Sequence, residues 1–309
     1  MKKNKWSPLV PGDLVDIVAP GMKPLPGTIK GIKSFLNSWG LKVRIDPKII
    51  GKDLICSNSK EYRLQNLKKA LIAKDSKMVW CMRGGYGSLH LLEGLSKVKA
   101  QPNKIFMGIS DITSLHSFLV QEWGWSTIHG SNIDRFALGK TLSAENKKFY
   151  EILFGKKESV QYKIKALNES AVRNKIIKGE VVGGNLITLQ SSFGTKFELN
   201  GKSKILFFED IGERAYRIDR VFEHMKQLNL FKGVRAVVFG QFTGGREPGG
   251  KNLVPALLKQ FASEQKFPVF SGVPSGHDVK QSPLPLGTSS KIQCGSKPFL
   301  ECSSGAFFE

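Results

Sequence analysis

The stretch KIFMGISDITSLHSFL, residues 104–119, carries the pattern that decides the fold. Its first part, KIFMG, is a short apolar run of the kind that forms buried strands, and apolar residues then recur at helical intervals from Ile112 to Leu119. Ser110 lies where one pattern gives way to the other. The segment therefore predicts a strand, a tight turn and a helix in immediate succession.

The same succession occurs elsewhere in the first half of the chain. LVDIVA (residues 14–19) is a strand candidate between two Pro-Gly turns, and a helix is expected over residues 28–39. KMVWCM (77–82) is another strand candidate, and it runs into the Gly-rich segment RGGYG (83–87) before a helical spacing begins at Leu89. Repeated units of this kind predict an α/β fold, in which helices cover both faces of a parallel sheet.

A chain of 309 residues has about twice the usual length of one domain, which favours two packed domains. The pattern weakens over the charged residues 156–178, and we interpret this stretch as the crossing between domains. Beyond it, residues 204–208 and 234–239 are strand candidates on either side of a helix with an apolar stripe. We therefore expect an N-terminal domain over residues 1–160 and a C-terminal domain over residues 161–309.

The net charge of +21, from 47 Lys and Arg against 26 Asp and Glu, makes the surface field strongly positive. Such a field attracts nucleic acids, anionic membranes or acidic substrates. The basic residues are spread along the chain, so we interpret them mainly as a solvated surface. A basic nucleic-acid-binding protein on a hydrolase-like scaffold is the alternative, but no recognised nucleic-acid motif occurs and no nucleic-acid partner is expected.

Several classes of protein are not expected. Pro8, Pro11 and Asp13 interrupt what would be the apolar core of a signal peptide, and no stretch approaches the roughly 18 apolar residues that span a bilayer. The 4 cysteines are scattered without a CxxC pair, which argues against a zinc site and a disulfide framework. We expect a cytoplasmic protein with no metal, no cofactor and no membrane partner.

Ser110 is the candidate nucleophile. It lies between the strand that ends at Gly108 and the helix that begins near Asp111, the setting of a nucleophile elbow, although Gly-Ile-Ser-Asp lacks the second glycine of that motif. A serine here also serves as a simple N-cap for the amide of Thr113. The two interpretations are compatible, because the free amides of a helix N-terminus, such as that of Asp111, also bind an oxyanion.

The Gly-rich segment at residues 83–87 also follows a strand directly. Its glycines let the backbone approach a ligand closely and point N–H groups at negative charge. The segment matches neither a P-loop nor a dinucleotide-binding motif, so by itself it indicates either an anion site or a flexible turn.

A serine nucleophile needs a base and a group that orients the base. Of the 5 histidines, His277 is our candidate base, because the loop VPSGHD (273–278) is bounded by Pro and Gly and is free to face a cleft. A solvated loop histidine is the alternative. Most of the other histidines lie on expected helices, and His129 follows a short strand-like segment.

Glu209 is the candidate orienting acid. It follows the apolar run KILFF (204–208), so its carboxylate is expected to be partly buried and must then be paired. Its partner is either a cation such as Arg214 or Arg217, or one ring nitrogen of His277. In the second case the other ring nitrogen faces the serine.

Taken in order, these motifs resemble those of the LD-carboxypeptidase family, the serine peptidases that include muramoyltetrapeptide carboxypeptidase and the microcin C immunity proteins. The similarity spans nearly the whole chain. The matching segments are GDLVDIVAP (12–20), RGGYGS (83–88), GISDIT (108–113), TIHG (127–130), VGGNL (182–186), FEDIGE (208–213), YRIDR (216–220), GH (276–277) and LPLG (284–287).

The resemblance implies a flavodoxin-like N-terminal domain that carries the serine and a smaller mixed α/β C-terminal domain that carries the glutamate and the histidine. It implies a Ser-Glu-His triad formed by Ser110, Glu209 and His277 in a cleft between the domains, with an oxyanion hole formed by the amides of Asp111 and Gly85. It also implies a homodimer.

The resemblance further implies a serine carboxypeptidase that removes the terminal D-alanine from murein tetrapeptide in peptidoglycan recycling. The alternative within the family is an immunity-type serine hydrolase that cleaves peptidyl or aminoacyl nucleotides. Such members usually carry an extra loop with an aromatic side chain between the serine and the glutamate. No aromatic-rich insertion separates Ser110 from Glu209, which favours the murein peptide as substrate.

Overall fold

A computed structural model describes residues 5–173 and 175–307 of the chain. The apolar runs of the first half form a sheet in which the parallel strands follow the order β2-β1-β3-β4-β5, the order of flavodoxin-like folds. These strands are β1 (Leu14–Val18), β2 (Lys42–Ile45), β3 (Met78–Cys81), β4 (Ile105–Gly108) and β5 (Thr127–His129).

Helices cover both faces of this first sheet, as expected. Helices α1, α5 and α6 pack with the side chains of Val15 and Ile17, whereas α2, α3 and α4 pack with those of Val18 and Val79 on the opposite face. The inner strands β3 and β4 are apolar because both of their faces are buried, whereas β2 at the edge of the sheet is partly exposed and carries Lys42 and Arg44. The helical segments are α1 (Thr28–Ser38), α2 (Lys60–Ile72), η1 (Leu89–Leu91), α3 (Leu92–Leu95), η2 (Ser110–Ile112), α4 (Thr113–Glu122), α5 (Ile133–Ala137) and α6 (Ser143–Leu153).

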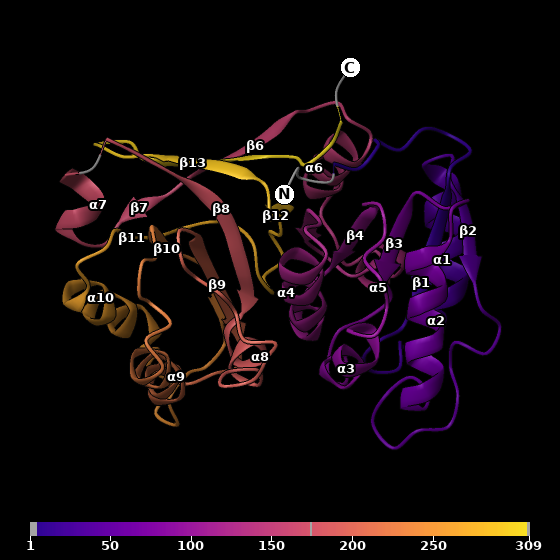
Figure 1. Ribbon diagram of the computed structural model, residues 1–309, viewed down its shortest axis with the longest axis horizontal. Coiled ribbons are helices and arrows are strands. Elements are labelled where there is room, and N and C mark those ends of the chain that lie inside the picture. Colours follow the sequence, from indigo (N-terminus) through magenta and orange to yellow (C-terminus); the bar gives the residue numbers. More distant parts are fainter. Residues whose placement is uncertain (1–4, 174, 308–309) are drawn as a thin grey trace.

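The second sheet is mixed, in the order β6-β14-β13-β8-β9-β10-β11-β7. Its two edge strands, β6 and β7, follow each other in the chain, so the sheet curls into a nearly closed barrel (Figure 1). The strands are β6 (Ser159–Lys163), β7 (Lys165–Ala166), β8 (Ile176–Asn185), β9 (Ile205–Ile211), β10 (Ala236–Thr243), β11 (Val269–Ser271), β13 (Ser289–Gln293) and β14 (Phe299–Ser303).

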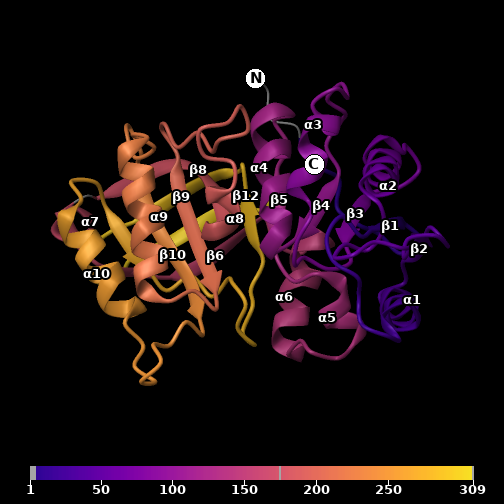
Figure 2. The ribbon, with the colours of Figure 1, turned by 90° about the horizontal axis from the view of Figure 1, so that it is seen from below.

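Three helices cover the outer face of the second sheet. Phe208 and Phe239 pack there against α8 (Leu186–Gln190), α9 (Ala215–Gln227) and α10 (Val254–Glu264), and Figure 2 shows α9 and α10 beside β9 and β10, away from the first sheet. The short helix α7 (Glu169–Arg173) follows β7. None of the helices formed by the described residues is long and apolar enough to cross a membrane.

The charged stretch 156–178, which we expected to serve as a crossing, contains β6, β7, α7 and the start of β8. In β6 the buried side chains of Val160 and Tyr162 alternate with exposed polar ones. A strand with one solvated face is rich in polar residues, so the sequence feature that indicates it is an alternation of apolar and polar residues. The many charged residues of this stretch obscured that alternation.

The two sheets meet closely. Strand β12 (Leu284–Leu286), although far along the chain, pairs with β5 and completes the first sheet, between the two lobes in Figure 1. At the end of β8, the absence of a side chain at Gly184 permits the backbone to approach Thr113, and the Asn185 amide donates to the Thr113 hydroxyl at 3.0 Å. One hydrophobic cluster spans both domains, with Ile128 in the first sheet and Phe207 in the second.

Candidate active site

Ser110 lies at the carboxyl end of β4, where the chain turns into η2 and α4. Its φ of 70° lies in the left-handed region, which residues with a side chain rarely adopt. A strained serine at a strand-to-helix turn is the backbone arrangement of a nucleophile elbow. Ser110 does not act as the N-cap, because Ile109 holds that position.

The Gly-rich segment packs directly against this turn. A Cβ at Gly84 would lie 2.9 Å from the Ser110 Cβ and 2.8 Å from the Ile109 carbonyl oxygen, so a side chain does not fit. Among the described residues, neither the Gly85 amide nor the Asp111 amide is taken up by a loop or turn carbonyl. The two amides that we expect to bind an oxyanion therefore have no competing partner of this kind.

The Asp111 carboxylate ties the Gly-rich segment to the serine turn. It is buried and accepts hydrogen bonds from the Gly87 amide at 3.2 Å and from the Ser88 amide at 2.9 Å. Burial raises the pKa of Asp111, and these hydrogen bonds offset only part of that effect. The side chain of Asp111 thus holds the Gly-rich segment in place, whereas its backbone amide is the group that we expect to bind the oxyanion.

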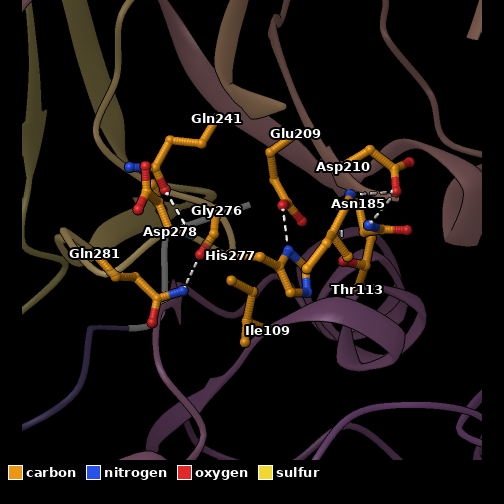
Figure 3. A network of polar contacts seen from close by, with 12 residues as sticks. Ile109, Thr113, Asn185, Glu209, Asp210, Gln241, Gly276, His277, Asp278 and Gln281 are labelled. Carbon is orange, nitrogen blue, oxygen red and sulfur yellow. Dashed lines mark hydrogen bonds and ion pairs between the residues drawn. The ribbon is translucent and has the colours of Figure 1, made fainter. Parts of the chain in front are cut away.

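Glu209 and His277 form the centre of the site. Glu209 lies in β9 with its side chain fully buried, and its Oε2 accepts a hydrogen bond from His277 Nδ1 at 2.7 Å (Figure 3). Arg214 and Arg217, the alternative partners, form ion pairs with other glutamates. The sequence allowed Glu209 to pair with an arginine or with His277, and in the structure it pairs with His277.

This pairing shifts the pKa of both groups. Burial alone would raise the pKa of Glu209, but His277 and His129 outweigh it and lower the pKa to about 2. Burial favours a neutral His277, and the Glu209 carboxylate reverses this and raises the pKa of the imidazole above its ordinary value. The pair therefore favours an imidazolium that forms beside the carboxylate.

The pair with Glu209 uses only one ring nitrogen of His277, Nδ1. Its Nε2 is buried and has no hydrogen-bond partner among residues 5–173 and 175–307. Figure 3 shows the ring between Glu209 and Ile109, the residue before Ser110. The structure records no hydrogen bond between Ser110 and His277. Hydrogen bonds of this kind are often long in the absence of substrate and shorten when it binds.

Contacts from the first domain hold the loop that carries His277. Arg135 Nη1 donates to the His277 carbonyl oxygen at 3.5 Å, and the Ser131 hydroxyl donates to the Gln281 amide oxygen. Gln281 in turn donates to the Gly276 carbonyl oxygen, so both ends of the loop are fixed. The position of the imidazole thus depends on both domains.

Sequence reasoning missed His129. This fully buried residue ends β5 beside Gly108 of β4, and its Nε2 lies 3.6 Å from Glu209 Oε1. Its strand position was the available signal, because the carboxyl ends of neighbouring parallel strands meet at one edge of a sheet. Sequence reasoning recognised the short strand-like segment before His129 but did not infer that it brings His129 to the edge of the sheet near Glu209.

Asp210, beside Glu209, has a pKa that burial and the neighbouring carboxylate raise to about 7. It accepts hydrogen bonds from the Asn185 side chain at 3.0 Å and from the Ile187 amide at 2.9 Å, which ties β9 to the end of β8. Within the described part of the chain, no group of three or more His, Cys, Asp and Glu side chains is arranged to hold a metal ion.

Comparison with known proteins matches both halves of the chain to one family. Residues 15–130 match the LD-carboxypeptidase N-terminal domain and residues 178–292 match the LD-carboxypeptidase C-terminal domain. A Rickettsia prowazekii protein, provisionally named a carboxypeptidase, is 39% identical over 85% of this chain and 83% of its own length. A probable murein peptide carboxypeptidase of Bacillus subtilis is 29% identical over 93% of this chain and 90% of its own length.

Solved structures share the fold. A crystal structure of an MccF-like protein from Bacillus anthracis superposes with a TM-score of 0.83 at 21% identity and covers 96% of this chain and 98% of its own. That of muramoyltetrapeptide carboxypeptidase from Oxalobacter formigenes gives a TM-score of 0.79 at 24% identity, with 93% and 99% covered. With both domains matched in order and a relative at 39% identity, the chain belongs to the LD-carboxypeptidase family.

Proposed function

We propose that this protein is a serine carboxypeptidase that removes the terminal D-alanine from murein tetrapeptide in peptidoglycan recycling. The observation that carries the proposal is the buried hydrogen bond between Glu209 and His277, formed beside the strained turn at Ser110. The similarity to the murein peptide carboxypeptidase of Bacillus subtilis supports the substrate class. The net charge of +21 also suits a peptide that carries several carboxylates.

In the proposed mechanism, the Ser110 hydroxyl attacks the carbonyl carbon of the amide between an L-centre and the terminal D-alanine. His277 Nε2 accepts the hydroxyl proton, and Glu209 stabilises the imidazolium that forms. The amides of Asp111 and Gly85 bind the tetrahedral oxyanion, an effect worth on the order of 3 kcal/mol for each donor in comparable sites.

The second half of the reaction uses the same groups. His277 gives its proton to the leaving amine of D-alanine as the carbon–nitrogen bond breaks, which leaves an acyl-enzyme on Ser110. Water then attacks this ester with His277 as base, and the tripeptide leaves with a new carboxylate.

The direct test is to incubate the protein with L-Ala-D-Glu-meso-diaminopimelate-D-Ala and to measure tripeptide and D-alanine by mass spectrometry. We expect release by the wild type and a loss of about a thousandfold or more for Ser110→Ala. Ser263→Ala, on the exposed face of α10, is the matched control and should retain full activity. Equal release by the wild type and Ser110→Ala would show that the serine mechanism is wrong.

Two parallel assays separate the alternatives. Preferential cleavage of an aminoacyl-sulfamoyl adenylate over the tetrapeptide would indicate the immunity-type substrate while leaving the serine mechanism in place. Tight binding of nucleic acid in a gel shift at about 150 mM salt, without peptidase activity, would instead indicate a nucleic-acid-binding protein.

A further inference from the structure

We propose that His129 is a positioning residue for the Glu209–His277 pair. It holds the second carboxylate oxygen of Glu209 from the other side of the domain boundary and so fixes the orientation and the charge of that carboxylate. The effect on catalysis rests on the serine mechanism proposed above, whereas the effect on the imidazole of His277 is measurable without any substrate.

The first argument is the unfilled side of Glu209. The side chain is fully buried, and His277 takes only Oε2, whereas Oε1 has no hydrogen-bond partner among the described residues. A buried carboxylate oxygen without a donor is costly. His129 Nε2 lies 3.6 Å from Oε1, close enough for an electrostatic contact that a small movement turns into a hydrogen bond.

The second argument is the tautomer that the neighbours of His129 require. Its Nδ1 lies 3.0 Å from the Ser275 hydroxyl, and its Nε2 faces a carboxylate, which only accepts hydrogen bonds. A neutral ring therefore carries its proton on Nε2 and accepts the Ser275 proton on Nδ1. Because Ser275 and His277 share a loop, one ring contacts both the acid and the segment that carries the base.

The third argument is that the ring has little freedom to turn away. His129 is fully buried, and its ring packs edge-to-face with that of Phe207 at a centroid distance of 5.3 Å. The ring of His116 lies at a centroid distance of 6.2 Å, and burial lowers the pKa of His116 to about 3, so that this neighbour is neutral. Of the two groups, Glu209 and His116, only Glu209 therefore presents a charge to His129.

Removing the Nε2 donor should change His277 in a defined direction. The Glu209 carboxylate would no longer share its charge with His129 and would stabilise the His277 imidazolium more strongly, which raises the pKa of His277. Asp210 and Arg135 also act on His277, one raising and one lowering its pKa, and neither is altered by the substitution. The freed carboxylate would also orient the imidazole less well, which lowers kcat.

Two substitutions separate the two nitrogens of His129. In His129→Gln the side-chain amide reaches the position of Nε2 and still donates to Glu209, whereas in His129→Asn it reaches only the position of Nδ1. We would label histidine with ¹³C, assign the His277 signal with His277→Gln, and titrate each protein by NMR alongside kcat and KM for the tetrapeptide. For His129→Asn we expect a raised His277 pKa, a kcat lower by on the order of tenfold and a KM within about twofold of the wild-type value. For His129→Gln we expect the His277 pKa, kcat and KM to stay near their wild-type values.

An unchanged His277 titration in both variants would overturn the proposal, even if both lost activity, because a merely structural role predicts that result. Ser275→Ala serves if His129→Asn does not fold, since it removes the partner of Nδ1, and it should raise the pKa of His277 to a smaller extent. A wild type without peptidase activity but with the expected shifts would refute the proposed function and support the positioning role.

Discussion

Replacing Glu209 by glutamine removes the charge beside His277 while nearly preserving the shape of the side chain. Because Glu209 is completely buried, water does not screen the loss. The carboxylate raises the pKa of His277, so in Glu209→Gln that pKa falls. The acidic limb of the pH profile of kcat/KM, which reports protonation of the base in the free enzyme, should therefore move to lower pH.

The size of the effect follows from the pKa of Glu209 itself. Its decrease from 4.5 to about 2 occurs despite burial and corresponds to about 3 kcal/mol in favour of the charged carboxylate, to which His277 and His129 both contribute. If the transition state, in which the imidazolium forms, loses that stabilisation, kcat decreases by about two to three orders of magnitude. KM should change little, because Glu209 contacts the base rather than the substrate.

The assay is D-alanine release from the tetrapeptide between about pH 5 and 9, with Glu151→Gln as the matched control. Glu151 on α6 forms an ion pair at 2.7 Å with the exposed Lys157, which solvent screens, and a pair of this kind contributes about 1 kcal/mol or less to stability. A Glu209→Gln enzyme that keeps more than about a fifth of kcat, or whose acidic limb stays in place, would refute the electrostatic reasoning.

Three further predictions concern packing, pH and assembly. Gly84→Ala puts a methyl group 2.9 Å from the Ser110 Cβ, so thermal unfolding should show a loss of about 1–3 kcal/mol together with a lower kcat; an unchanged melting temperature would contradict the close approach. His116 has a pKa lowered by burial from 6.5 to about 3, so the stability it contributes is present above pH 6.5 and is lost as the pH falls toward 3. Between pH 6.5 and 5 this amounts to about 2 kcal/mol in urea unfolding, and His116→Gln should lose less than the wild type over that interval, whereas equal losses would refute the assignment. The expected homodimer should give about twice 34.2 kDa in light scattering, and the mass of one chain would exclude it.

The elements that sequence reasoning located well are the buried ones. The strand expected over residues 104–108 is β4, and the helix expected over residues 28–39 is α1, because strands buried on both faces and helices with one apolar face leave strong patterns. At the site, the burial of Glu209 was predictable from the apolar run before it. The pairing of Glu209 with His277 rather than with an arginine was one of two possibilities until the loop and the strand were placed in space.

The parts that escaped prediction depend on pairing between distant segments. β12 is a short strand with a proline at its centre, and its partner β5 lies more than a hundred residues earlier in the chain, so no local pattern predicts the pairing. For the same reason His129 was not connected with Glu209, since the two belong to different domains. Contacts of this kind arise from topology, and only the carboxyl-edge rule for parallel strands gives a hint of them.

The return of β12 to the first sheet has a consequence for how the protein is made. A ribosome makes strands β1 to β5 well before it reaches residues 284–286, and until then the edge of β5 is unpaired and open to contact with other chains. The loop that carries His277 lies just before the same strand. Burial of that edge and arrival of the histidine are therefore nearly simultaneous during synthesis, so a growing chain would have no functional hydrolase until its exposed strand was also protected.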